Sequence, residues 1–276
     1  LHAEVSQPVF LGCVWALAGL SLIFVLVRCF IKMMTFKRVS SDDVIAFIAW
    51  GMFLANIILW TVKSPILYRN YEVLQGKHPF DQVEIERYGS FIRCIGAFTS
   101  IFYASLWSVK LSVLLFFRRL GNQIRRYEIW WWCVTAVTVS TWLICMADVD
   151  WPCNTKPIQW IMLNCSSQNK INFQNRTFYA NCALDILSDC LIVSIPILIL
   201  WNVHVPLRKK IILTGIFSAT VIVMVVSIIR VTVVNSKHQS AEIAWLVFWS
   251  FVENGTAIMI SCVASFRQLF VASQDQ

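Results

Sequence analysis

Long apolar stretches separated by short polar segments dominate the pattern of the chain. Seven of these stretches are about 20 residues long, the length that an α-helix needs to cross the hydrocarbon core of a bilayer. They predict membrane spans at Val9–Ile31, Asp43–Thr61, Ile95–Phe117, Ile129–Ala147, Phe178–Trp201, Ile211–Val234 and Ile243–Ala264. We therefore predict an all-α polytopic membrane protein with a single seven-helix transmembrane domain over residues 1–276.

Composition supports this assignment. Hydrophobic residues make up 58% of the 276 residues and charged residues only 14%, whereas a soluble domain carries about a quarter charged residues. Too few polar side chains remain to cover a surface that faces water. The net charge of +8 does not indicate nucleic acid, because basic residues at the rim of a membrane protein face anionic lipid head groups. The lipid bilayer is the expected partner.

The density of basic residues predicts the orientation of the bundle. Cytoplasmic loops carry an excess of Lys and Arg. The loops on one side hold ten basic residues in 28 positions, and the loops on the other side hold nine in 71. The dense loops are 32–41, 118–126 and 202–210. We expect them to face the inner side, with the N-terminus outside and the C-terminus inside.

Two glycosylation sequons agree with this orientation. Asn164 and Asn175 each begin an Asn-x-Ser/Thr triplet, and both fall in the loop between the fourth and fifth spans. We therefore predict a glycoprotein, since such acceptors are modified on the outer side. A third sequon at Asn254 lies within the last span and should be unreachable.

Four of the ten cysteines lie on or near the predicted outer face, where disulfides persist. They are Cys94, Cys153, Cys165 and Cys182, and four cysteines allow three pairings that sequence cannot distinguish. We favour Cys153 with Cys165, which lie in one loop, with the other two as candidates for a second bridge. No metal-binding pattern is present in the sequence, so we expect neither a metal nor another cofactor.

Ionisable residues inside the predicted spans are the strongest candidates for function. A charged side chain in hydrocarbon is costly, so such residues usually face the bundle interior. Asp185 and Asp189 share one face of the fifth span, and Glu253 lies near the middle of the seventh. Arg230, in the sixth span, either reaches the lipid head groups or pairs with Asp185. Trp249 is a candidate for the wall of a cavity beside Glu253.

Two interpretations of these residues remain open. The acidic residues either form a buried hydrogen-bond network that fixes helix packing, or they line a pocket for a ligand or substrate. Pro196, which follows Asp189 in the same span, frees a backbone carbonyl and is expected to kink the helix. Such a kink often shapes a cavity.

A second charged cluster is predicted at the inner rim. Arg28 ends the first span, Asp42 and Asp43 open the second, and Lys110 lies two turns from the inner end of the third. The two acidic residues follow Ser40 and are well placed for the first turn of a helix. We expect ion pairs among Arg28, Asp43 and Lys110, with either a structural role or a role in gating.

Five segments of the chain carry charged, aromatic and proline residues at characteristic positions, namely "VRCFIKMMTFKRVSSDDVIAFIAW", "SLWSVKLSVLLFFRRL", "CNTKPIQWIMLNC", "DCLIVSIPILILW" and "FVENGTAIMISCVASFRQLF". They resemble one family, the fungal seven-helix integral membrane proteins that carry the rhodopsin domain label. The resemblance runs over nearly the whole chain and implies a rhodopsin-like bundle similar to that of G-protein-coupled receptors. Some members are receptor-like proteins linked to surface sensing by fungal pathogens. This chain has Ala264 where the family usually has Pro.

The resemblance leaves two functions to weigh. A retinal protein needs a lysine in the last helix for the Schiff base, and Ile243–Ala264 contains none, so we exclude light sensing. The first hypothesis is a receptor-like sensor in the plasma membrane, with an extracellular or lipophilic ligand bound by Asp185, Asp189, Arg230 and Glu253. A G protein at the inner loops is the partner that this hypothesis suggests.

The alternative is an intramembrane biosynthetic enzyme, a cyclase or isomerase that acts on a lipophilic secondary metabolite in the endoplasmic reticulum. Related proteins occur in fungal metabolite gene clusters. A protonated carboxylic acid in an apolar cavity could act as general acid on an alkene or epoxide, and nearby aromatic rings would stabilise the resulting cation. Asp189 or Glu253 would be the acid, with Asp185 as its neighbour. Both hypotheses predict the same acidic cavity.

Overall fold

A computed structural model describes residues 6–36, 40–74, 76, 81–120, 125–165, 167–202, 207–235 and 243–272. The described residues form nine α-helices and no strand. The helices are α1 (Gln7–Phe36), α2 (Ser41–Leu74), α3 (Gln82–Leu120), α4 (Arg125–Ala147), α5 (Trp151–Thr155), α6 (Ile158–Asn164), α7 (Gln168–Asn202), α8 (Leu207–Asn235) and α9 (Ile243–Ala272).

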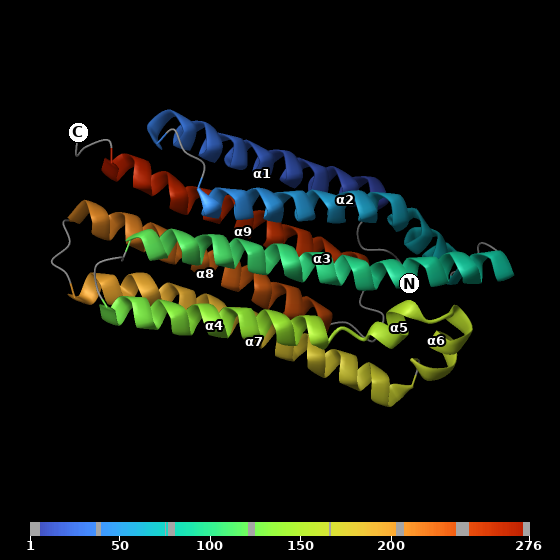
Figure 1. Ribbon diagram of the computed structural model, residues 1–276. Helices are drawn as coiled ribbons and strands as arrows, with labels where there is room; N and C mark the ends of the chain where they lie inside the picture. Colours follow the sequence, from blue (N-terminus) through green and yellow to red (C-terminus); the bar gives the residue numbers. More distant parts are fainter. Residues whose placement is uncertain are drawn as a thin grey trace.

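The long helices form an elongated bundle, and the short helices α5 and α6 lie together at one end of it (Figure 1). Each predicted span lies inside one long helix, so the prediction of an all-helical membrane bundle is confirmed. Six helices of the described chain are long and apolar enough to cross a bilayer, namely α1, α2, α3, α4, α7 and α9. The described apolar part of α8 is shorter, Thr220–Thr232.

Exposed apolar side chains show which surface faces lipid. Large hydrophobic residues such as Ile23, Phe30, Ile129 and Ile222 expose more than half of their surface. Exposure of these side chains would be unfavourable in water, but it is not unfavourable in lipid, because lipid tails are as apolar as the side chains themselves. The bundle therefore contacts the hydrocarbon of a bilayer.

Aromatic rings fill the space between α1, α2, α3 and α9. Phe251 of α9 lies at the centre, with its ring 5.4 to 6.3 Å from the rings of Phe10, Phe53 and Phe98. Trp60 contacts Phe10 and Phe98 from α2. These side chains are almost completely buried, so helices far apart in sequence are held together by one aromatic cluster.

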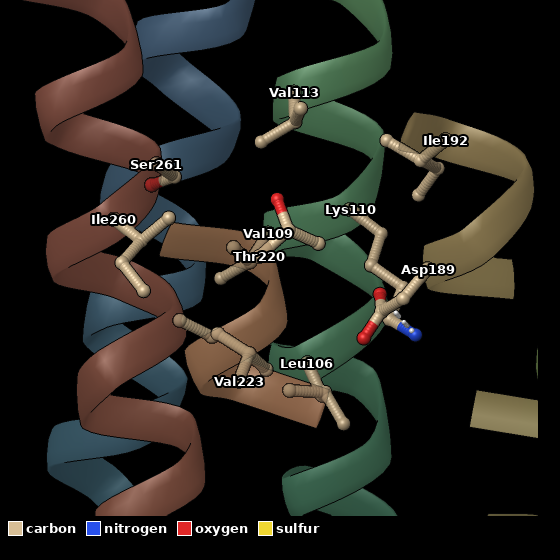
Figure 2. Close-up of a pocket in the computed structure, with 11 residues that line it drawn as sticks. Leu106, Val109, Lys110, Val113, Asp189, Ile192, Thr220, Val223, Ile260 and Ser261 are labelled. Atoms are coloured by element: carbon tan, nitrogen blue, oxygen red, sulfur yellow. Dashed lines mark ion pairs between the residues drawn. The ribbon is translucent and has the colours of Figure 1, made fainter. Parts of the chain in front are cut away.

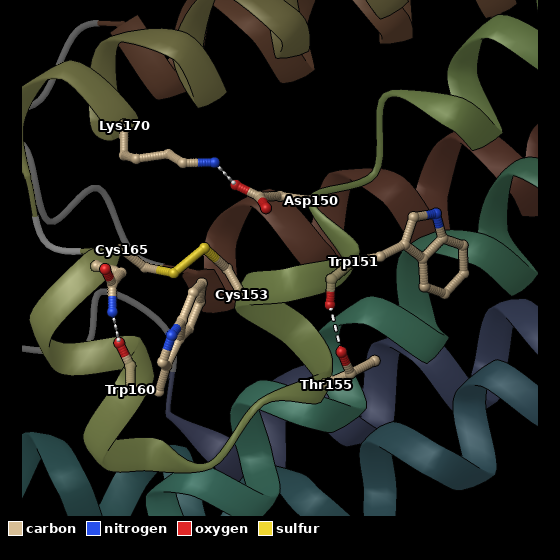
Figure 3. The surroundings of a disulfide bond; sticks show 8 residues. Asp150, Trp151, Cys153, Thr155, Trp160, Cys165 and Lys170 are labelled. Carbon is tan, nitrogen blue, oxygen red and sulfur yellow. Dashed lines mark hydrogen bonds and ion pairs between the residues drawn. A yellow bond between two sulfur atoms is a disulfide. The ribbon is translucent and has the colours of Figure 1, made fainter.

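The cap formed by α5 and α6 is fixed by a disulfide and by close packing on α3. Cys153 and Cys165 are bonded to each other (Figure 3). The favoured pairing is therefore the one present, whereas Cys94 and Cys182 are free thiols, which is a correction to the proposed second bridge. Gly96 of α3 allows the approach, because a Cβ at this position would lie 2.7 Å from the Cβ of Asn154.

Candidate functional site

Five ionisable side chains from four helices meet inside the bundle. They are Lys110 of α3, Asp185 and Asp189 of α7, Arg230 of α8 and Glu253 of α9. Each exposes 5% of its surface or less. The acidic residues of α7 point inward together because residues four apart share one helix face.

Lys110 joins α3 to α7 through both aspartates. Its Nζ lies 2.7 Å from Asp185 Oδ1 and 2.8 Å from Asp189 Oδ1. The same ammonium donates to Ser188 Oγ at 2.6 Å and to the backbone oxygen of Asp185 at 2.8 Å. A buried charge is stabilised only when it is paired and hydrogen-bonded in this way.

The expectation that Lys110 joins the inner-rim cluster is therefore wrong. Side chains on a helix tilt toward its N-terminus, and in α3 that direction leads away from the inner rim. The long lysine side chain carries its charge toward Asp185 and Asp189 instead of toward Asp43.

Ser227 of α8 connects the carboxylates of two other helices. Its hydroxyl contacts Asp185 Oδ2 at 2.8 Å and Glu253 Oε1. Arg230, one turn further along α8, forms an ion pair with Glu253, with 3.1 Å between Nε and Oε2. We name this set, with Lys110, Asp185 and Asp189, the central network.

The structure corrects both expectations for Arg230. Its ion-pair partner is Glu253, not Asp185, and its 3% exposure excludes a side chain that reaches the head groups. The guanidinium also lies 5.1 Å from the ring centre of Phe102 and 5.6 Å from that of Phe178. Cation–π contacts of this kind are strongest where water is excluded.

A cavity of about 50 Å³ lies beside the central network, between α3, α7, α8 and α9. Its walls are mostly apolar, and the carboxylate of Asp189 points into it (Figure 2). The lining residues are Leu106, Val109, Lys110, Val113, Asp189, Ile192, Thr220, Val223, Ala257, Ile260 and Ser261. Among the described lining residues, Lys110 and Asp189 carry the charges.

Asp189 differs from Glu253 in the surroundings of its second carboxylate oxygen, because Glu253 Oε2 also lacks a hydrogen bond but forms an ion pair with Arg230. Oδ1 accepts from Lys110, but Oδ2 is buried without a hydrogen-bond partner among the described residues. Unpaired buried polar atoms are rare and costly in native proteins. Asp189 is therefore the group of the central network that is best placed to bind a molecule in the cavity.

The other predicted ligand residues do not line the cavity. Asp185, Arg230 and Glu253 are occupied by contacts within the central network. Trp249 packs edge-on against Trp245, with 5.9 Å between ring centres, and lies outside the described cavity lining. The sequence therefore predicted the helices of the site but not which residue faces the cavity.

Two serines that bond to charged groups of the central network were not predicted, Ser227 within it and Ser188 beside Lys110. Ser188 and Ser227 are ordinary residues of apolar spans, and isolated serines in membrane helices often bond only to their own backbone. Ser227 precedes Arg230 by three residues and therefore lies on the same helix face. The three-residue interval between Ser227 and Arg230 is the sequence feature that could have indicated the role of Ser227.

The inner-rim cluster holds α1, α2 and α9 together. Arg28 donates to Asp43 Oδ1 and Asp42 Oδ2 at 2.9 Å each and to the backbone oxygen of Ser261 at 3.0 Å. Lys32 lies 2.6 and 2.7 Å from the same two carboxylates. The participation of Lys32 was not predicted. Two cations and two anions balance in this cluster.

The predicted glycosylation sites differ in accessibility. Asn164 at the end of α6 and Asn175 in the second turn of α7 are both exposed, whereas Asn254 is buried. Asn254 accepts a hydrogen bond from Ser105 at 3.1 Å. Among the described residues, no group of three or more His, Cys, Asp or Glu side chains could hold a metal ion.

Comparison with known proteins identifies the family. The fungal rhodopsin domain matches residues 27–272, which include the central network, the cavity and the inner-rim cluster. No protein of curated function and no solved structure matches the chain. The match confirms the resemblance found in the sequence, and the chain belongs to the fungal rhodopsin domain family.

Proposed function

We propose that the protein is a receptor-like membrane sensor that binds a small lipophilic ligand in the cavity between α3, α7, α8 and α9. The observation that carries this proposal is the buried Oδ2 atom of Asp189, which has no hydrogen-bond partner among the described residues. Ligand pockets combine apolar walls with a few convergent polar groups. The cavity beside Asp189 has this composition.

The central network connects the cavity to two further helices. A ligand at Asp189 would change the charge that Lys110 shares between Asp189 and Asp185. Asp185 is joined through Ser227 to α8 and through the same hydroxyl to Glu253 of α9. Ligand binding would therefore shift the balance between two arrangements of α7, α8 and α9, which is the action of a sensor.

The volume of the cavity favours a sensor over an enzyme. At about 50 Å³ it is smaller than the cavity of about 150 Å³ that admits benzene in another protein. A whole lipophilic molecule enters only if the helices separate. A site that must rearrange to bind suits signalling, whereas catalysis requires a preorganised pocket.

The enzyme alternative rests on the same carboxyl group. Asp189 in an apolar wall is placed to transfer a proton to an alkene or epoxide, with Glu253 and Asp185 connected to it through the central network. The substrate would be a lipophilic metabolite and the location the endoplasmic reticulum. The sensor would act in the plasma membrane, with a G protein at its inner side as partner.

Eleven of the 28 residues in the inner loops that would contact a G protein form a set that lies outside the described residues. Residues 37–39, 121–124 and 203–206 belong to this set. The partner and the predicted orientation, with the N-terminus outside, therefore rest on the density of basic residues in the sequence.

A stability screen tests the proposal. The full chain in lipid nanodiscs is heated with a panel of lipophilic amines, alcohols and carboxylic acids, and each compound is then recovered and identified by mass spectrometry. A sensor is stabilised by at least one compound, which is recovered unchanged, and Asp189→Asn loses the effect. Conversion of a compound supports the enzyme, and a panel that stabilises nothing contradicts a ligand cavity.

A further inference from the structure

The charges of the central network do not balance. Three carboxyl groups, those of Asp185, Asp189 and Glu253, are connected to two cations, Lys110 and Arg230. All five are at least nine-tenths buried, so solvent ions do not screen them. When every group is ionised, one negative charge is in surplus. A proton or a bound cation must balance it.

The geometry places this surplus at Asp189. Asp185 accepts from Lys110 and Ser227, and Glu253 contacts Ser227 and Arg230. Asp189 has Lys110 on one oxygen, while the other oxygen is the buried, unpartnered Oδ2. Its carboxylate points into the cavity (Figure 2).

We infer that the ligand of this cavity is a lipophilic amine whose ammonium group pairs with Asp189, an inference that rests on the proposed function. An ammonium supplies both things that the site lacks, a hydrogen-bond donor for Oδ2 and one positive charge. Charge-assisted hydrogen bonds of this kind are about twice as strong as neutral ones. A cavity of about 50 Å³ suits a small head group.

The residues that line the cavity explain why the ligand is expected to have a lipophilic part. Val113, Thr220 and Ile260 are cavity residues that remain partly exposed at the surface of α3, α8 and α9. An alkyl chain attached to the ammonium would leave the cavity along such side chains and enter the hydrocarbon. The helices then need to separate only enough for the ammonium group to reach Asp189, because the alkyl chain is buried against these side chains and the lipid.

Other chemical classes fit less well. A carboxylate ligand would add a fourth negative charge beside Asp189, and like charges in a low-dielectric interior repel strongly. An alcohol would donate one hydrogen bond but would leave the surplus charge in place. The site therefore selects by charge.

The test uses three probes with the same alkyl chain. The full chain is placed in phosphatidylcholine nanodiscs at pH 7, and 1-aminooctane, 1-octanol and octanoate are titrated while thermal unfolding is followed by tryptophan fluorescence. We expect a saturable rise in Tm with 1-aminooctane alone. A parallel set of nanodiscs with phosphatidylethanolamine shows whether a lipid ammonium occupies the site, because it would then weaken the effect of 1-aminooctane.

Two variants test separately the charge of Asp189 and the free volume of the cavity. Asp189→Asn keeps the shape but removes the charge, and its affinity for 1-aminooctane should fall about tenfold to hundredfold. Ala257→Leu fills the cavity but leaves the central network intact, and it should also lose binding. Asp148→Asn, outside the network at the end of α4, is the matched control and should bind as the unmodified chain does.

The outcomes separate this inference from the proposed function. Equal stabilisation by 1-octanol, or a response to 1-aminooctane that survives in Asp189→Asn, overturns the amine inference but leaves a ligand cavity. Binding of 1-aminooctane that requires Asp189 but converts the amine to a product overturns the sensor and keeps the inference. Failure of all three probes with the unmodified chain overturns the inference.

Discussion

Lys110 of α3 and Asp189 of α7 form a buried ion pair of 2.8 Å, although three other helices, α4, α5 and α6, lie between α3 and α7 in the sequence. The lysine holds one oxygen of the carboxylate and leaves the other beside an apolar cavity. The same residue pair therefore fixes two helices to each other and presents a charge to a binding site.

Replacement of Lys110 by Met should destabilise the bundle strongly. It leaves Asp185 and Asp189 without their shared cation, and breaking a buried pair costs about 3–5 kcal/mol. The measurement is thermal unfolding of the purified chain in detergent. Combining Lys110→Met with Asp185→Asn should restore part of the loss, because one uncompensated charge is removed.

Lys170→Met is the matched control for that experiment. Lys170 pairs with Asp150 at 3.0 Å in the cap, but its side chain is 42% exposed, and exposed pairs contribute about 1 kcal/mol or less. Equal losses from Lys110→Met and Lys170→Met would show that the central network does not stabilise the bundle.

Gly96→Ala should displace the cap from α3. The added Cβ would lie 2.7 Å from the Cβ of Asn154, and overpacking of this kind costs about 1–3 kcal/mol. Gly51→Ala is the control, because nothing lies within 4 Å of its added Cβ and alanine is the better helix former. Hydrogen exchange of α5 should increase in the first variant only; unchanged exchange would mean that Gly96 is not a packing contact.

Loss of the disulfide should loosen the same cap without unfolding the bundle. The bond closes a loop with a sequence separation of 12, and loops of this size contribute about 2–4 kcal/mol. Cys153→Ser should speed hydrogen exchange over residues 151–165 and leave α3 unchanged, whereas the free thiol Cys94 should tolerate the same change. If both variants exchange alike, the disulfide does not hold the cap.

Glycosylation tests the predicted orientation. With the N-terminus outside, the exposed Asn175 should carry a glycan in a eukaryotic host, and Asn175→Gln should migrate faster on a gel unless glycosidase has been added. Asn164 is expected to behave likewise, and the buried Asn254 should carry no glycan. Absence of any glycan from Asn164 and Asn175 together would count against this orientation.

The sequence predicted the helices well because the length of each apolar run determines whether it crosses the bilayer as a helix. A run of about 20 apolar residues has no favourable alternative to a helix in a bilayer, so every predicted span lies inside a helix of the structure. The ends were less predictable. α3 begins at Gln82, well before the predicted Ile95, because its polar first turns are stabilised by contact with α2 and the cap.

Partners within the site could not be predicted from spacing alone. The acidic face of α7 followed from the four-residue interval between Asp185 and Asp189, but the partner of Lys110 depends on how far a long side chain extends along α3. The pairing of Arg230 with Glu253 depends on the relative rotation of α8 and α9. Neither the length of an apolar run nor its periodicity determines how far a lysine side chain extends or how two helices are rotated relative to each other.

The central claim is that a ligand at Asp189 changes the arrangement of the helices. Its most direct test is pulsed electron paramagnetic resonance between spin labels on noncanonical residues at the exposed positions Ile129 of α4 and Ile222 of α8, with and without 1-aminooctane. We predict a shifted distance distribution in the otherwise unmodified chain and in Asp148→Asn, and none in Asp189→Asn. A saturating ligand that leaves the distribution unchanged, or a shift of equal size in Asp189→Asn, would contradict the account.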